Sequence, residues 1–193
     1  MTMTTDLAAL TWPLHTDRLV LRPAATGDAD ATWQFRRRED VSRWLTRASA
    51  TPDEHRTWFE APDNLAQALV IERSGTVIGD LMVKIEDAWA QAEIIEHSRR
   101  VQAELGWVLH PEHAGHGFAT EAIRELLRLC FKDLGLRRVT ATCFAANDAS
   151  WRLMERVGMR REFYTVRDSL HRSGEWLDCI GYALLADEWR SSV

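Results

Sequence analysis

The spacing of apolar residues along the chain predicts a protein built from short strands and amphipathic helices. Short runs in which apolar residues alternate or cluster, bounded by proline, glycine or aspartate, are typical of strands. The predicted strands lie at 18–23, 68–73, 76–85, 103–111 and 137–144. Ser74-Gly75 separates two of them and predicts a hairpin, and Ser173-Gly174 predicts another hairpin in the tail at 162–189.

Two helices are predicted between the first two strands. The first has an aspartate-rich start and continues with helical spacing through Trp33 and Trp44. The second is capped by Thr51, with Pro52 at its first position and acidic residues in its first turn. The polar stretch at 86–102 leaves the first hairpin, and we expect it to be a mobile or substrate-facing loop.

A strongly amphipathic helix is predicted to begin near Phe118 and to end at Gly135. Its apolar residues share one face, namely Ala119, Ala122, Ile123, Leu126, Leu127 and Cys130. A shorter helix begins at Asn147 or Asp148 and ends at Gly158. Together these elements predict an α+β fold with a mixed, mostly antiparallel central sheet flanked by helices and one strand-helix-strand unit.

Composition indicates a single domain over residues 1–193. Hydrophobic residues make up 46% and charged residues 27% of the chain, as in ordinary soluble globular proteins. No apolar run approaches the roughly 20 residues that a membrane-spanning helix needs. The N-terminus has no basic start followed by a long apolar stretch, so it does not resemble a secretory signal. We therefore expect a cytoplasmic protein that does not bind membranes.

Cysteine usage and charge exclude further classes. Cys130, Cys143 and Cys179 are widely separated, which argues against a disulfide framework or a zinc-binding pair and predicts buried thiols. The formal net charge is -5, and the basic clusters are interrupted by acidic and apolar residues. We therefore expect no nucleic-acid partner.

The segment HPEHAGHGFATEA at 110–122 is the clearest candidate for chemistry. Pro111 and the glycines prevent a continuous helix that would bring its three histidines together, and no thiolate completes a ligand set, so we expect no metal. The segment also lacks the third glycine of a dinucleotide fingerprint and the lysine of a P-loop. It is either a simple turn or an anion site, because Gly115 and Gly117 let backbone N–H groups converge ahead of a helix N-terminus.

Two longer motifs extend this segment. The stretches ELGWVLHPEHAGHGFATEAIRELLRLCF and NDASWRLMERVGM resemble the acyl-CoA-binding core of the GNAT acetyltransferase superfamily. The stretches TDRLVLRP and GEWLDCIGYALLADEW resemble its branch of ribosomal-protein alanine and serine N-acetyltransferases. The resemblance covers nearly the whole chain and implies a GNAT-like fold that uses acetyl-CoA.

The resemblance also implies how acetyl-CoA is held. Backbone amides of the glycine loop would bind the pyrophosphate, the preceding strand would pair with the pantetheine arm, and an asparagine would bind pantetheine. The residues assigned to the cosubstrate in this way are Trp107, Val108, Leu109, Ala114, Gly115, His116, Gly117, Phe118, Ala119, Thr120, Asn147 and Met154. Glu112 and His116 replace residues that are glutamine or basic in many members, so backbone amides, helped by histidines, must do more of the phosphate binding.

The catalytic residues are less clear from the resemblance. Many relatives place a tyrosine seven residues after the asparagine to protonate the departing thiolate, but Met154 occupies that position here. The resemblance implies Ser150 as its substitute, although a serine at a helix start also serves as a cap. Glu104, acting through water, is our first candidate for the general base and Asp168 the second; either could equally be an ordinary surface acid.

Three functions remain open from the sequence. The first is acetylation of a protein or peptide N-terminus, which needs little base catalysis because an α-amine has a low pKa. The second is acetylation of a small amine or antibiotic, which Trp33, Trp44 and Trp58 would suit if they lined a pocket. The third is a CoA-binding module without turnover. An apolar edge in the tail hairpin is also compatible with a homodimer.

Overall fold

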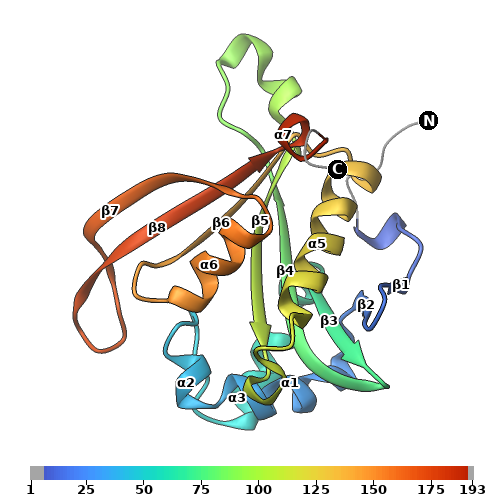
Figure 1. The fold of residues 1–193 in the computed structure, drawn as a ribbon, viewed down its shortest axis with the longest axis vertical. Coiled ribbons are helices and arrows are strands. Elements are labelled where there is room, and N and C mark those ends of the chain that lie inside the picture. The colour runs from blue at the N-terminus through green and yellow to red at the C-terminus, as the bar shows by residue number, and fades with distance from the viewer. Residues whose placement is uncertain (1–6, 191–193) are drawn as a thin grey trace. The chain divides into compact units, whose positions relative to one another are not determined.

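The computed structural model describes residues 7–190, except for the side chain of Arg190. The described residues form two compact units (Figure 1). The N-terminal unit comprises residues 7–83 and 106–125, and the C-terminal unit comprises 84–105 and 126–190. Strands β4 and β5 and helix α5 each continue from one unit into the other. The expectation of one domain over residues 1–193 stays a prediction.

The N-terminal unit contains an antiparallel array of strands. Its strands are β1 (Leu14–His15), β2 (Val20–Pro23), β3 (Ala68–Arg73), most of β4 (Thr76–Glu86) and the second half of β5 (Gln102–Leu109). Strands β1 to β4 pair in chain order, each antiparallel to the next, and β5 lies beside β4. The hairpin predicted at 68–85 is therefore confirmed, and its turn has positive φ at both Ser74 and Gly75.

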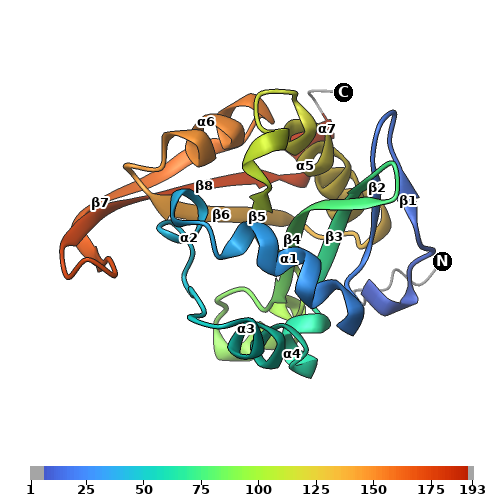
Figure 2. The ribbon, with the colours of Figure 1, turned by 90° about the horizontal axis from the view of Figure 1, so that it is seen from below.

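Helices cover both faces of the N-terminal unit's sheet. They are α1 (Ala29–Arg36), α2 (Glu39–Ser42), α3 (Pro52–Phe59), α4 (Pro62–Leu65) and the first turns of α5 (Phe118–Arg128), with 3-10 turns at Leu7–Ala9, Thr26–Asp28 and Pro111–His113. Figure 2 shows α1, α3 and α4 on one face of β3 and β4 and α5 on the other. The Thr51 cap of α3 is confirmed, because its side chain accepts the Glu54 N–H.

The C-terminal unit contains the rest of the sheet. Its elements are the first half of β5, β6 (Arg138–Phe144), α6 (Asp148–Arg156), β7 (Arg160–Leu170), β8 (Trp176–Leu185) and α7 (Ala186–Arg190), with a 3-10 segment at Ala92–Ser98 and a π-helical turn at Leu129–Asp133 after α5. Strand β5 pairs with β6 in parallel, while β6–β8 and β8–β7 are antiparallel. The strand order β1-β2-β3-β4-β5-β6-β8-β7 confirms a mixed, mostly antiparallel sheet.

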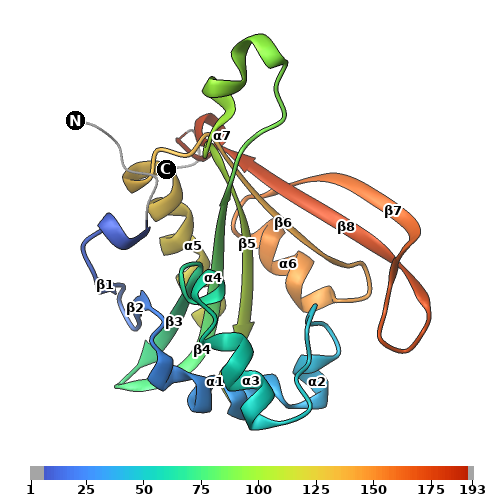
Figure 3. The ribbon, with the colours of Figure 1, turned by 180° about the vertical axis from the view of Figure 1, so that it is seen from behind.

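Strand β7 is the outer strand of a long hairpin with β8, which Figure 3 shows beside α6. Its large apolar side chains are exposed, whereas most residues of β8 are buried. The exposed large apolar residues of this hairpin are Phe163, Tyr164, Val166 and Leu170 on β7 and Trp176 at the start of β8. The apolar character expected for this edge is therefore present, whereas the homodimer stays a prediction.

One predicted helix is wrong in its length. The helix expected to run from the aspartate-rich start through Trp44 ends at Arg36, and α2 follows as a separate short helix. The break lies at Arg38, whose backbone is extended. The Arg36 side chain turns to Asp80 instead of solvent, with Nη2 and Oδ1 2.6 Å apart. The ion pair joins the last turn of α1 to β4. The spacing of apolar residues along the helix does not predict this contact.

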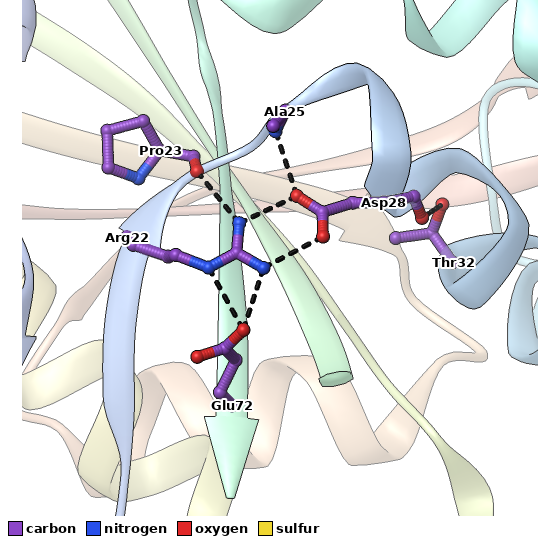
Figure 4. A network of polar contacts seen from close by, with 6 residues as sticks. All are labelled: Arg22, Pro23, Ala25, Asp28, Thr32 and Glu72. Carbon is purple, nitrogen blue, oxygen red and sulfur yellow. Dashed lines mark hydrogen bonds and ion pairs between the residues drawn. The ribbon is translucent and has the colours of Figure 1, made fainter. Parts of the chain in front are cut away.

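An ion-pair network centred on Arg22 joins β2, β3 and the turn before α1 (Figure 4). The Arg22 guanidinium donates to both oxygens of Asp28, at 2.7 and 2.8 Å, and to Glu72 at 2.7 and 2.9 Å. Burial would raise the pKa of Asp28, but hydrogen bonds from Arg22 and from the Ala25 N–H lower it below its usual range. The network therefore keeps the Asp28 carboxylate charged at neutral pH.

Buried His55 links α3 to α1. Its Nε2 lies 2.9 Å from the Thr32 hydroxyl, and its ring packs between Trp33 and Trp58 at 5.5 and 5.7 Å. Burial, reinforced by the charge of Arg36, lowers the pKa of His55 to about 4, so the imidazole is neutral at pH 7.

None of the helices within residues 7–190 combines the length and apolar character that crossing a membrane requires.

Candidate acyl-CoA site

The segment from His110 to Gly117 turns the chain from β5 into α5. The His110 N–H donates to the Ile78 carbonyl, which keeps the end of β5 beside β4. Gly115 and Gly117 both have φ of +80°, a conformation that glycine adopts without strain. Helix α5 begins at Phe118, as predicted, and the first amides of a helix have no intrahelical acceptor. The loop therefore brings N–H groups to the positive end of the α5 dipole.

Arg18 fastens the loop and the first turn of α5 to the segment before β2. Its Nε donates to Glu121 at 2.7 Å, and its Nη1 donates to the His116 carbonyl at 3.0 Å. Glu121 also accepts the Arg18 N–H and the Thr16 hydroxyl, at 2.9 and 2.6 Å. Burial would raise the pKa of Glu121, but these hydrogen bonds lower it. These contacts thus hold the His116 carbonyl of the loop toward Arg18.

Phe118 is buried at the start of α5 and contacts two cations. The Arg18 guanidinium carbon lies 4.6 Å from the ring centroid, and that of Arg73, at the end of β3, lies 4.8 Å from it. Both distances are in the range of cation–π interactions. Two arginines from other segments of the chain therefore lie next to the loop, in addition to the charged residues of the loop itself.

The three histidines of the loop have different surroundings. His110 accepts the Glu112 N–H through Nδ1 and packs on Phe35, so it caps the turn. Partial burial, together with His110 and Arg73, lowers the pKa of His113, so that this ring is mostly neutral at pH 7. His116 is exposed and contacts Phe118 at 5.7 Å. Within residues 7–190, no group of three or more His, Cys, Asp or Glu side chains is arranged to hold a metal ion.

The end of β5 is held closely against β4. A Cβ atom at Gly79 would lie 2.5 Å from the Val108 carbonyl oxygen, so only glycine permits this approach. Val108 is buried, while Trp107 and Leu109 are half-buried on the other face of the strand. The pairing of β5 with β6 covers Gln102 to Glu104. The residues predicted to meet pantetheine thus lie at the end of a strand that β4 supports.

The remaining predicted residues belong to the C-terminal unit. Asn147 is the N-cap of α6, as predicted, because its side chain accepts the Ser150 N–H. Glu104 is half-buried opposite Thr140, and its charge contributes, after that of Glu86, to the raised pKa of Lys84. Asn147 and Ser150 are therefore placed together, whereas Glu104 lies on a different element.

Ser150 has an unforeseen neighbour, Cys143 on β6. Burial raises the pKa of the Cys143 thiol to about 11, although a hydrogen bond with the Ser150 side chain acts in the opposite direction. The thiol is therefore neutral at pH 7.

Met154 is buried, with a relative exposure of 1%. Asp168 is exposed on β7 and accepts the Thr165 and Ser169 hydroxyls.

Sequence reasoning missed Arg18, Glu121 and Arg73. Arg18 and Glu121 are 103 positions apart, so no local spacing relates them. Both lie in motifs that carried the family resemblance, which is the one signal that could have singled them out. Arg73 has no such signal, because it is simply the last residue before a predicted hairpin turn.

Comparison with known proteins agrees with this geometry. A family model described as an acetyltransferase (GNAT) domain matches residues 18–160. The uncharacterized N-acetyltransferase YnaD of Bacillus subtilis is 29% identical, over 91% of this chain and 98% of its own. A GNAT-family acetyltransferase structure from Bacillus anthracis has a TM-score of 0.76 at 27% identity, covering 91% and 99% of the two chains. RimJ of Mycobacterium smegmatis, in complex with CoA-disulfide, has a TM-score of 0.71 at 24% identity, covering 88% and 83%.

The positive φ of Gly117 predicts that Gly117→Ala weakens CoA binding. The methyl group itself meets only ordinary contacts, the nearest being Arg18 at 3.5 Å, so the cost is conformational. A non-glycine residue in this region costs about 1–2 kcal/mol, and the loop relaxes to avoid it, which misaligns the amides. We expect CoA affinity, measured by calorimetry, to fall about 10-fold.

Gly27→Ala is the matched control. No atom lies within 4 Å of its added Cβ, and Gly27 has no positive φ. This variant is expected to bind CoA like the unmodified protein. Unchanged affinity in Gly117→Ala would contradict the role given to the loop conformation.

Proposed function

The chain belongs to the GNAT family of acetyltransferases and is an N-acetyltransferase, and we propose that it transfers acetyl from acetyl-CoA to the N-terminal α-amine of a protein or peptide. The observation that carries the proposal is the turn between β5 and α5, where Gly115 and Gly117 precede the helix N-terminus. Oriented N–H groups at a helix N-terminus favour phosphate. GNAT enzymes use acetyl-CoA, whose pyrophosphate is the matching anion.

The proposed cosubstrate contacts are those that the family resemblance implies. In the N-terminal unit, the amides from Ala114 to Thr120 bind the pyrophosphate, and Trp107 to Leu109 pair with the pantetheine arm as with an added strand. One amide of that strand polarises the thioester carbonyl. In the C-terminal unit, Asn147 binds pantetheine while its side chain caps α6. The cap fixes the orientation of Asn147 before any ligand arrives.

The reaction is a direct transfer. The neutral amine attacks the thioester carbon, an N–C bond forms, and the C–S bond breaks as the tetrahedral intermediate collapses. Ser150 donates its hydroxyl proton to the departing thiolate and regains one from solvent. As the intermediate collapses, the extra proton on its positively charged nitrogen passes through water to Glu104, which leaves a neutral amide; Glu104 then releases the proton to solvent. Because the Cys143 thiol is neutral, it does not compete with Ser150 as an anion.

Amine chemistry favours an α-amine over a lysine side chain. With a pKa near 7.8, an α-amine is roughly 10–15% neutral at pH 7, whereas a lysine near 10.4 is only about 0.04% neutral. The difference corresponds to roughly 3 kcal/mol that a lysine acetyltransferase must supply with a stronger base. Glu104, which acts through a water molecule, is a modest base. An α-amine needs no stronger base than this.

A small-molecule amine is the second candidate. Its support is the group of tryptophans on the early helices, Trp33, Trp44 and Trp58. The structure weakens this argument, because Trp33 and Trp58 pack on the buried ring of His55. Trp44 is half-buried beside Arg43. Trp33 and Trp58 therefore contribute to helix packing, and Trp58 also borders a pocket of about 400 Å³. The low pKa of an α-amine is the argument that favours the peptide acceptor.

Product analysis tests the proposed function. The protein is incubated with acetyl-CoA and separate pools of Ser- or Ala-starting peptides, acetyl-blocked lysine peptides, polyamines and amine antibiotics, and products are identified by mass spectrometry. We expect acetylation of free N-termini, with N-terminally blocked versions of the same peptides unreacted. Acetylation of only the small amines would overturn the acceptor assignment. CoA binding without any product would favour a module that has lost turnover.

Replacing Ser150 tests its role as proton donor. Ser150→Ala is expected to lower kcat about 10- to 100-fold while changing KM for acetyl-CoA less than about 3-fold, because only the protonation of the thiolate is lost. Ser150→Thr keeps a hydroxyl and should recover part of kcat. Equal kcat in the Ala variant and the unmodified enzyme would remove Ser150 from the mechanism.

A further inference from the structure

Arg73 is an exposed arginine at the end of β3, immediately before the turn at Ser74 and Gly75. The turn is tight, with positive φ at both positions, so the Arg73 backbone is held at a fixed place in the β3–β4 hairpin. Its guanidinium carbon lies 4.8 Å from the centroid of the Phe118 ring. Phe118 is the first residue of α5, so Arg73 stands beside the helix N-terminus.

The other arginines near this place are already neutralised. Arg18 is paired with Glu121, at 2.6 Å between Nη2 and Oε2. Arg22 is paired with Asp28 and with Glu72, the residue next to Arg73 in the chain. For Arg73 itself, no carboxylate of the described part of the chain lies within ion-pair distance. Among the residues that the structure describes, the positive charge of Arg73 therefore has no carboxylate partner.

That charge acts on the loop. It contributes to lowering the pKa of His113, after burial and His110, so its field reaches the segment between β5 and α5. The same segment has the N–H groups at the positive end of the α5 dipole. A cation without a counterion, held beside such a helix end, raises the local affinity for anions.

We propose that Arg73 binds a phosphate of CoA and supplies the positive charge that the loop lacks at Glu112 and His116. Arg73 belongs to a different element from the loop, so it acts as an addition to the backbone amides. A guanidinium presents parallel N–H donors that match two phosphate oxygens, and Phe118 limits how far the side chain can swing. The inference rests on the proposed use of acetyl-CoA.

CoA offers two kinds of phosphate, the pyrophosphate and the 3′-phosphate of its ribose. The experiment measures calorimetric affinities of the unmodified protein and Arg73→Gln for CoA and for 3′-dephospho-CoA at low salt. Arg37→Gln is the matched control, because Arg37 is an exposed arginine that follows α1 and its loss changes net charge equally. Thermal unfolding confirms that each variant is folded.

We expect Arg73→Gln to weaken CoA binding about 10-fold and Arg37→Gln by less than about 2-fold. Loss with CoA alone would assign Arg73 to the 3′-phosphate, and equal loss with both ligands would assign it to the pyrophosphate. Affinity unchanged in Arg73→Gln, or reduced as much in Arg37→Gln, would overturn the inference and leave the proposed function intact. An unmodified protein that binds no CoA would overturn both.

Discussion

The contact between Arg18 and Glu121 is the constraint on which the candidate site depends. Glu121 lies in the first turn of α5, accepts three hydrogen bonds from Thr16 and Arg18, and forms an ion pair with Nη2 of Arg18. A carboxylate there is favourable in itself, because it lies near the positive end of the helix dipole. Since Arg18 also holds the His116 carbonyl, the same side chain connects the first turn of α5 to the loop and fixes the direction of that carbonyl. Fixing this peptide group constrains the direction of the Gly117 N–H, which belongs to the same peptide plane.

The polar contacts of the N-terminal unit divide into two kinds. Arg22 with Asp28 and Arg36 with Asp80 join helices or turns to strands and are satisfied within the protein. Arg18 is also satisfied, yet it adjoins the loop and organises it. Arg73 is different, because its charge has no carboxylate partner among residues 7–190. A protein that pairs its other nearby arginines so thoroughly leaves this one available for an external anion.

The C-terminal unit has a different chemical character. Asn147 caps α6, and the Ser150 hydroxyl lies against a thiol that burial keeps neutral. A hydroxyl in such a place can give up a proton to a thiolate without a competing anion beside it. An α-amine acceptor needs no strong base. Glu104, acting through water, is the proposed base of this unit and is sufficient for such an amine. The proposed mechanism therefore uses only chemical groups that are present among the described residues.

Local features of the structure could be predicted from the sequence, and long-range ones could not. The hairpin at 68–85, the start of α5 at Phe118 and the Asn147 cap follow from turn glycines, amphipathic spacing and capping preferences. The helix expected through Trp44 was wrong in its length because the backbone is extended at Arg38, and the contact of Arg36 with Asp80, 44 positions away, cannot be seen in local spacing. Likewise, Arg73 and Cys143 gained significance only when the fold placed them beside Phe118 and Ser150. The family resemblance identified the loop, but spacing alone left a simple turn as an alternative.

Amide hydrogen exchange shows directly whether backbone N–H groups ahead of α5 bind the phosphates of CoA. Exchange is followed residue by residue by NMR, without and with saturating CoA, for the loop at 114–120 and for α1 as an internal reference. We expect slower exchange of the amides of Gly115 to Ala119 when CoA is bound and no change in α1. Binding of CoA that leaves those amides exchanging at their former rate would contradict this expectation.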